Sequence, residues 1–378
     1  MVHSLPQASI EALRSILCHS SNRLLRDQEK TLRLLHLYML KTGLRSHKSI
    51  GNDIIPKLVS IGCIHDAHCV LDRLIYCNEM SWNFLITGYV ECGLFECAFL
   101  IYHDMLKYEK DPSGHTLVAL LKTCAEIGNI ERGIEIHKEA ERLGFLETNL
   151  FVGGALVDMY AKCGYLSHAR NAFDKLRGQN VVTWTALITG YVENGLPEEA
   201  LFCYQELEHG PIPLVLDAII LISGLKACGL IRSAHKGREI HTQVAMKGLE
   251  RDLLVGSSLV DMYAKCGILS SAQNVFDSLL LPGQDVVSWN SLIVGYLEHG
   301  MGEEALRHFE QMQMRGVCPD NIIFVCVLKA CGSINALEKG RLVYGEIVMK
   351  GLEKDHLVGN AIVDCYAKCY ILEEALEV

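Results

Sequence analysis

The stretch VVSWNSLIVGYLEHGMGEEALRHFEQMQMRGVCPD, from Val286 to Asp320, predicts two α-helices joined by a tight turn. The first helix carries apolar residues at the spacing of one helix face, at Trp289, Leu292, Ile293 and Tyr296. Gly300 ends this helix, because glycine adopts the left-handed conformation of a helix end without steric cost. The second helix has its own apolar face, made by Ala305, Leu306, Phe309 and Met312. A hairpin this small cannot bury both faces alone, so it must stack on neighbours.

Related hairpins recur along the chain in a fixed order. Its only three tryptophans each lie near the start of such a hairpin and are 102 and 105 residues apart, at Trp82, Trp184 and Trp289. Between them lie a short hairpin type, as in Phe151–Leu176, and a type with a Leu-Lys-x-Cys core, as in Leu120–His137. The three types cycle with a period near 103 residues. This pattern predicts an all-α fold, a right-handed α-solenoid (superhelix) of tandem antiparallel helical hairpins.

Cysteine is abundant, with 16 residues in 378, but its positions follow the repeats. Cys163, Cys266 and Cys369 are 103 residues apart, and no C-x-x-C pair occurs. We therefore expect small buried thiols in a reducing compartment, with redox or metal roles as the alternative. The longest apolar runs, such as Leu214–Leu225, are about half a membrane span, so no membrane partner is expected.

The net charge of −10 restricts the choice of ligand. A protein that binds nucleic acid usually presents a basic face to the phosphates. Either the lysines and arginines of this chain gather on one face, or its ligand is not a nucleic acid. The first 26 residues are rich in serine and arginine, with Glu11 as their only acid, which indicates either an organellar transit peptide or a helix that caps the solenoid.

The phrases VVSWNSLIVGY, LVDMYAKCG and VLKACGS occur in tandem and resemble the pentatricopeptide repeat family, in particular its subclass with alternating P, L and S motifs. The tetratricopeptide repeat fits less well, because its glycine position is occupied by Ile86, Ile188 and Ile293. The resemblance implies an N-terminal segment, 1–12, and tandem repeats over 13–378. These are L 13–47, S 48–78, P 79–113, L 114–149, S 150–180, P 181–217, L 218–252, S 253–285, P 286–320, L 321–355 and a partial S 356–378. Because the last repeat stops at Val378, we expect a C-terminally truncated chain.

The resemblance also implies a function. Members of this subclass bind single-stranded organellar RNA sequence-specifically, which implies one base per P or S repeat here. We expect a C-to-U editing specificity factor or a similar RNA-processing protein, located in the mitochondrion or alternatively the chloroplast. No catalysis, cofactor or metal is expected, and editing-complex proteins or a deaminase would act in trans. His137 and Glu139 form an H-x-E, but the C-x-x-C that a zinc deaminase needs is missing.

The family implies which residues contact RNA, namely the fifth and the last residue of each repeat. In this chain the set is Asn52, Asn78, Asn83, Ser113, Asn180, Thr185, Asp217, Ser257, Asp285, Asn290, Asp320 and Asn360. Asn, Ser and Asp at these places could equally be helix N-caps. The second residue of a repeat, such as Val182 or Val287, would lie between bases in the family, or would be an ordinary core valine.

Some repeats depart from this pattern. Gly154 has no side chain, and the fifth residues of the long repeats, Val118, Ile222 and Val325, cannot hydrogen-bond a base. Two other functions therefore stay open at this point. One is a protein-binding helical-repeat scaffold, which suits the acidic charge. The other is the N-terminal part of an editing enzyme whose deaminase domain is missing from this sequence.

Overall fold

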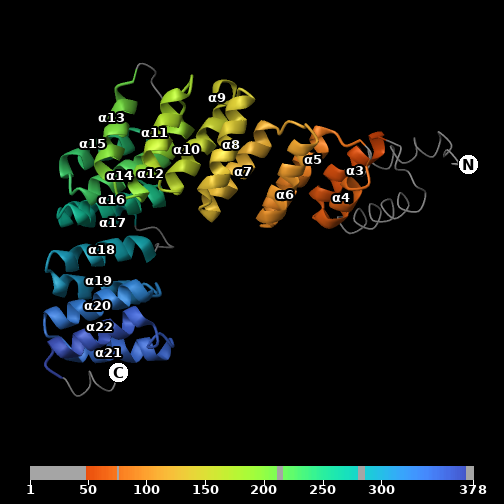
Figure 1. Cartoon of the computed structure of the whole chain (residues 1–378). Coiled ribbons are helices and arrows are strands. Elements are labelled where there is room, and N and C mark those ends of the chain that lie inside the picture. The colour runs from red at the N-terminus through yellow and green to blue at the C-terminus, as the bar shows by residue number, and fades with distance from the viewer. Residues whose placement is uncertain (1–47, 75, 211–215, 280–285, 372–378) are drawn as a thin grey trace, which may run out of the picture. The chain divides into compact units, whose positions relative to one another are not determined.

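A computed structural model of the chain describes residues 48–74, 76–210, 216–279 and 286–371. These residues form twenty α-helices and no strand, which confirms the predicted all-α solenoid of antiparallel hairpins (Figure 1). The chain divides into two compact units, residues 1–186 and 187–378. Residues 1–47 and Asp285 lie outside the described residues. The two alternatives for the N-terminus, a transit peptide or a capping helix, concern this part of the chain.

Each hairpin has a first and a second helix. In the first unit the first helices are α3 (Lys48–Ser60), α5 (Glu79–Glu91), α7 (Gly114–Ile127) and α10 (Leu150–Lys162). The second helices there are α4 (Ile64–Leu71), α6 (Phe95–Lys107), α8 (Ile130–Arg142) and α11 (Leu166–Lys175), with a single extra turn, α9 (Phe145–Thr148). The boundary between the units falls inside α12 (Val181–Glu193).

The second unit continues the same alternation. Its first helices are α14 (Ala218–Leu230), α16 (Leu253–Lys265), α18 (Val286–Glu298), α20 (Asn321–Ser333) and α22 (His356–Lys368). Its second helices are α13 (Pro197–Glu208), α15 (Ala234–Met246), α17 (Leu269–Ser278), α19 (Gly302–Met314) and α21 (Leu337–Met349). Every first helix begins at the residue where the sequence places the start of a repeat.

The tryptophans form the centre of the packing between hairpins. Trp289 is completely buried and meets Phe276 edge to face, with ring centroids 4.6 Å apart. The same arrangement recurs in the first unit, where Trp184 and Phe173 are 4.5 Å apart. Gly300, with φ +73°, takes the left-handed turn after α18, and Met301 donates its backbone N–H to the Tyr296 carbonyl at 2.9 Å. The sequence predicted both the buried tryptophan and this glycine turn.

Small residues allow the helices to approach closely. At Gly256 an added Cβ would lie 2.5 Å from Leu279 Cδ2, and at Gly153 it would lie 2.6 Å from Leu176 Cδ2. These paired glycines and leucines occupy the same places in two short repeats. They explain why a glycine is kept inside a helix, where it would otherwise be destabilising.

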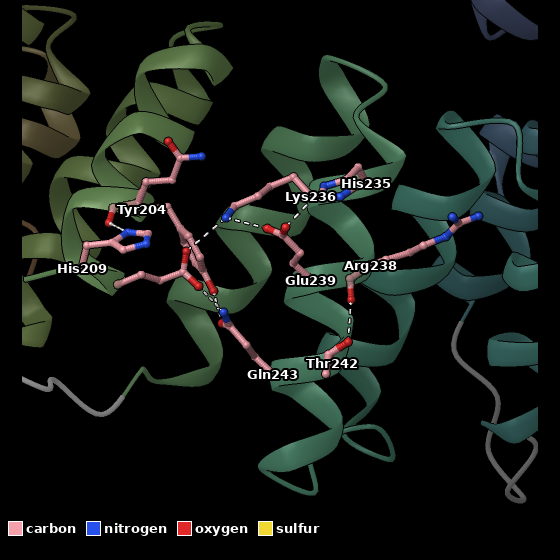
Figure 2. A network of polar contacts seen from close by, with 10 residues as sticks. Tyr204, His209, His235, Lys236, Arg238, Glu239, Thr242 and Gln243 are labelled. Atoms are coloured by element: carbon pink, nitrogen blue, oxygen red, sulfur yellow. Dashed lines mark hydrogen bonds and ion pairs between the residues drawn. The ribbon is translucent and has the colours of Figure 1, made fainter.

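Polar contacts link neighbouring second helices (Figure 2). Tyr204 of α13 donates to the Gln243 side chain of α15 at 2.5 Å, and Gln243 in turn donates to Glu208. Lys236 contacts Glu208 at 3.1 Å and Glu239 at 2.8 Å. Because Tyr204, Lys236 and Glu208 are largely buried and paired, they fix how one hairpin sits on the next.

The cysteines of the described residues form no disulfide, and many are buried. Burial raises the pKa of the Cys124 and Cys228 thiols to about 12, so both are protonated at neutral pH. A protonated, buried thiol is a poor nucleophile and packs as a small apolar group. This supports the interpretation of the cysteines as core residues.

Candidate nucleic-acid interface

The last residue of each P repeat lies directly before a first helix and caps it. The side chains of Ser113, Asp217 and Asp320 accept the backbone N–H groups of the third helical residues Thr116, Ile220 and Ile323, at 3.2, 2.9 and 2.9 Å. Two S repeats show the same bond, since Asn78 accepts from Ser81 at 2.8 Å and Asn180 from Thr183 at 2.9 Å. These side chains are therefore N-caps. In the asparagines and aspartates, capping uses one side-chain oxygen and leaves the second polar atom for another partner.

In three repeats the fifth residue reaches the last residue. The Asn52 side-chain oxygen accepts the Asn78 backbone N–H at 3.0 Å. The Asn83 oxygen accepts the Ser113 backbone N–H, also at 3.0 Å. Asn290 Nδ2 donates to Asp320 Oδ2 at 2.8 Å. The structure thus brings together the members of these three predicted pairs, which are about 30 residues apart in sequence, at the N-terminal ends of neighbouring first helices.

The third residue of the following helix completes two of these clusters and was missed by the sequence reasoning. Ser81 Oγ donates to Asn52 Oδ1 at 2.8 Å, and Thr116 Oγ1 donates to Asn83 Oδ1 at 2.6 Å. Both residues are completely buried. The signal in the sequence was a small hydroxyl side chain recurring at the third position, in Ser81, Thr116, Thr183 and Ser288.

The second residues of the repeats are exposed, so the interpretation of Val182 and Val287 as core valines is wrong. Eight apolar residues at this position are each more than half exposed: Met80, Phe151, Val182, Ile219, Leu254, Val287, Ile322 and Leu357. In the P repeats a buried hydroxyl residue follows each of them, as Ser288 follows Val287. The usual preference, apolar inside and polar outside, is thus reversed at the start of these helices.

Other predicted residues are not brought into such pairs by any contact described here. Thr185 donates to the Val181 carbonyl of its own helix at 2.6 Å. Ser257 is buried, and its hydroxyl donates to the Leu254 carbonyl at 3.0 Å. Asn360 is exposed on α22. Gly154 lies next to Val182 in space, because a Cβ added at Gly154 would be 3.4 Å from Val182 Cγ1. The partner predicted for Ser257, Asp285, lies outside the described residues.

Charge is distributed unequally between the two sets of helices. The first helices of the described chain contain eight lysines and nine acidic residues, whereas the second helices, α9 aside, contain 11 basic and 19 acidic residues. The acidic surplus of the sequence therefore lies mainly on the second helices. Among the first helices, Lys122, Lys226 and Lys329 occupy one repeat position and are exposed.

The described part of the chain contains neither a metal-binding cluster nor a membrane-spanning helix. No group of three or more His, Cys, Asp or Glu side chains there is placed to hold a metal ion. None of its helices combines the length and apolar character needed to span a membrane.

The fold and this site define a class, a helical-repeat protein that presents repeated side chains along its first helices. A family model described as PPR repeat matches residues 80–109, 154–181 and 182–209, and one described as PPR repeat family matches 284–333. The chain is a pentatricopeptide repeat protein.

Relatives from Arabidopsis thaliana agree with this. One pentatricopeptide repeat-containing protein is 34% identical over 348 residues, 91% of this chain and 47% of the relative. A second, named mitochondrial, is 34% identical over 343 residues, 90% of this chain and 33% of the relative. A third, named chloroplastic, is 33% identical over 330 residues, 87% of this chain and 52% of the relative. The chain thus spans between a third and about half of the length of these curated relatives.

Among solved structures, the chain resembles the crystal structure of the pentatricopeptide repeat protein PPR10 in complex with an 18-nucleotide psaJ RNA element. The TM-score is 0.71 at 23% sequence identity, and the match covers 98% of this chain and 56% of PPR10. This similarity establishes the fold.

Proposed function

We propose that this chain binds single-stranded RNA sequence-specifically through the N-terminal ends of its first helices. The observation that carries the proposal is the set of exposed apolar second residues beside the capped and hydrogen-bonded polar residues. Apolar side chains can pack against the faces of unpaired bases, and Asn, Ser and Asp side chains can bond base edges. The fold shared with PPR10, which was crystallised with RNA, supports the proposal.

The proposed unit of recognition is one base for each P or S repeat. The pairs Asn52 with Asn78, Asn83 with Ser113, and Asn290 with Asp320 support this, because each pair forms a single polar cluster. The charge distribution also fits. The near balance of charge on the first helices reduces the repulsion that a net charge of −10 would otherwise impose on RNA.

We further propose that the protein acts in organellar RNA modification or processing, as a C-to-U editing specificity factor or in a similar role. Relatives named mitochondrial and chloroplastic support an organelle, with the mitochondrion as our proposal. In this role the chain is an adaptor without catalysis of its own. A deaminase or other editing-complex proteins would supply the chemistry in trans.

The test compares two exposed apolar residues of one repeat. Ile322 lies at the second position of α20 and is 58% exposed, whereas Leu342 lies on the second helix α21 and is 75% exposed. Ile322→Glu should weaken binding to a single-stranded RNA by roughly tenfold, since it removes a base contact and adds a negative charge. Leu342→Glu should change it little.

The RNA affinities of the wild type and of both variants are measured by filter binding at several salt concentrations. RNA binding that weakens with salt, and weakens further only in Ile322→Glu, supports the proposal. Equal effects of the two variants, or no salt-dependent RNA binding by the wild type, would contradict it. The second result would favour a scaffold that binds protein through the acidic second helices.

A further inference from the structure

The long repeat 321–355 contains a polar pair of the kind that the P repeats use, built from different positions. Its fifth residue, Val325, cannot form a hydrogen bond. Its first residue can, because Asn321 Nδ2 donates to Asp355 Oδ2 at 3.0 Å. Asp355 is the last residue of the repeat. The donor and acceptor match those of Asn290 and Asp320 in the preceding repeat, at 2.8 Å.

The capping geometry of Asp355 makes this contact available. Asp355 Oδ1 alone accepts two backbone N–H groups of α22, from Leu357 at 3.0 Å and Val358 at 3.1 Å. Oδ2 takes no part in capping and is the atom that meets Asn321. The cap thus fixes the carboxylate, so its second oxygen is held in a defined direction.

The surroundings of the pair are those of the other polar clusters. Ile322, beside Asn321, is 58% exposed, and Leu357, two residues after Asp355, is 70% exposed. Both are second residues of their repeats. A base that packs between these two side chains would therefore have the amide and the carboxylate near its edge.

In the two other described long repeats, the first residue has no amide side chain. In the repeat 114–149 the first residue is Gly114, and an added Cβ there would lie 2.5 Å from Asn149 Nδ2, so the last residue fills the space. In the repeat 218–252 the first residue is Ala218, and the last, Asp252, caps α16 through Oδ1 just as Asp355 caps α22. Ala218 is thus a natural control for Asn321.

We propose that Asn321 and Asp355 form an additional base-recognition site, so that the long repeat 321–355 discriminates between bases. This inference rests on the proposed RNA binding. An ionised carboxylate only accepts hydrogen bonds, so it favours uracil or guanine, whose pairing edges carry a ring N–H, over cytosine or adenine, whose corresponding ring nitrogen is bare. The recognised base is the neighbour of the one read by Asn290 and Asp320.

The experiment uses the full chain and a pool of single-stranded RNAs randomised at each base, with bound molecules sequenced. The wild type should enrich uracil and guanine over cytosine and adenine at the neighbouring base by about tenfold, the lower end of the range of one hydrogen bond to a charged group. Asn321→Ala should reduce this enrichment to the level of the repeat 218–252, which has the carboxylate but no amide, and should leave the enrichment at the base read by Asn290 and Asp320 unchanged. Ala218→Asn should create a similar enrichment at one further base.

Three results would overturn the inference. If Asn321→Ala keeps the wild-type enrichment, or Ala218→Asn adds none, Asn321 is only a contact between helices. If the wild type shows no enrichment at the base read by Asn290 and Asp320 either, the proposed function itself fails and the inference fails with it. Thermal unfolding by circular dichroism confirms that each variant is folded, and Ala at the first turn of α20 keeps a strong helix former.

Discussion

The first and second helices of the repeats differ in what they expose. Second helices carry an acidic surplus and contact one another through polar pairs, such as Lys236 with Glu208. First helices expose apolar side chains at their second residue and hold polar clusters beside them. Val287 is 54% exposed, while Trp289, two residues later in α18, is fully buried. The difference teaches that one short helix can stabilise the array with one face and expose a separate set of side chains at its N-terminal end.

The largest expected effect tests the buried face of a first helix. Trp289→Ala removes a side chain that packs on Phe276, so we expect a loss of roughly 3–5 kcal/mol in unfolding free energy from the cavity. Chemical denaturation followed by circular dichroism measures it. If the variant unfolded like the wild type but lost RNA binding, the tryptophan would contact RNA and the proposed separation of faces would be wrong.

The next effect concerns the exposed edge of the same repeat. Asp320 caps α20 through Oδ1 and accepts from Asn290 through Oδ2. Asp320→Asn keeps the cap but adds a donor, so the preference at this base should move from uracil toward cytosine by about 1–2 kcal/mol. Matched RNA oligomers that differ only at that base show the change in a filter-binding titration. An unchanged ranking of uracil and cytosine would mean that the two residues only cap and connect helices.

A smaller effect is expected from the second helices. Lys236→Met breaks the largely buried pair with Glu208, and should cost about 1 kcal/mol of stability without changing RNA binding. Lys339→Met is the control, since its pair with Glu310 is half exposed and should contribute less. Loss of RNA affinity in folded Lys236→Met would show that second helices take part in recognition.

The smallest effect is a pH dependence of stability. Burial lowers the pKa of His137 and His241, whose Nδ1 atoms each lie 2.8 Å from a tyrosine hydroxyl. Below the ordinary histidine pKa, the unfolded chain therefore binds more protons than the folded chain. The free energy of unfolding consequently decreases as the pH is lowered. Tm should be lower at about pH 5.5 than at about pH 7.5.

His241→Gln should reduce this difference in Tm, because it removes one of the buried histidines. His235→Gln, at an exposed site on the same helix α15, is the matched control. Equal pH dependence in the wild type and both variants would exclude His241 as a source of the effect.

Much of the fold could be predicted from sequence because helix periodicity and turn glycines are local signals. The apolar face of Val286–Asp320 predicted the buried tryptophan, and the repeat starts coincide with helix starts. The side on which Val287 lies could not be predicted. The first turn of α18 is apolar on more than one side, at Val286, Val287 and Trp289, so the residue types there do not distinguish an exposed valine from a buried one.

The candidate site was predictable only in part, for a different reason. Its residue types at fixed positions could be recognised, but its hydrogen bonds join residues about 30 positions apart. The role of Ser81 and Thr116 depends on hydrogen bonds from their hydroxyls to the asparagines of the preceding repeat, and a local sequence pattern does not contain such contacts. The sequence did not indicate Asn321, because the family pattern concerns the fifth residue, here Val325, whereas the amide in this repeat belongs to the first residue.

These clusters affect how such arrays can be recombined. Asn52, Asn78 and Ser81 meet at one point, although Ser81 belongs to the next repeat. An exchange of whole repeats at residue 79 would separate Asn52 and Asn78 from Ser81. The third residue of the incoming repeat would then take the place of the Ser81 hydroxyl. Crossovers placed after the third residue of a first helix would transfer all three together, whereas in the repeat 321–355 they would separate Asn321 from Asp355. For clusters like that of Asn52, Asn78 and Ser81, the module that keeps its contacts when it is moved between arrays therefore includes the junction between two repeats.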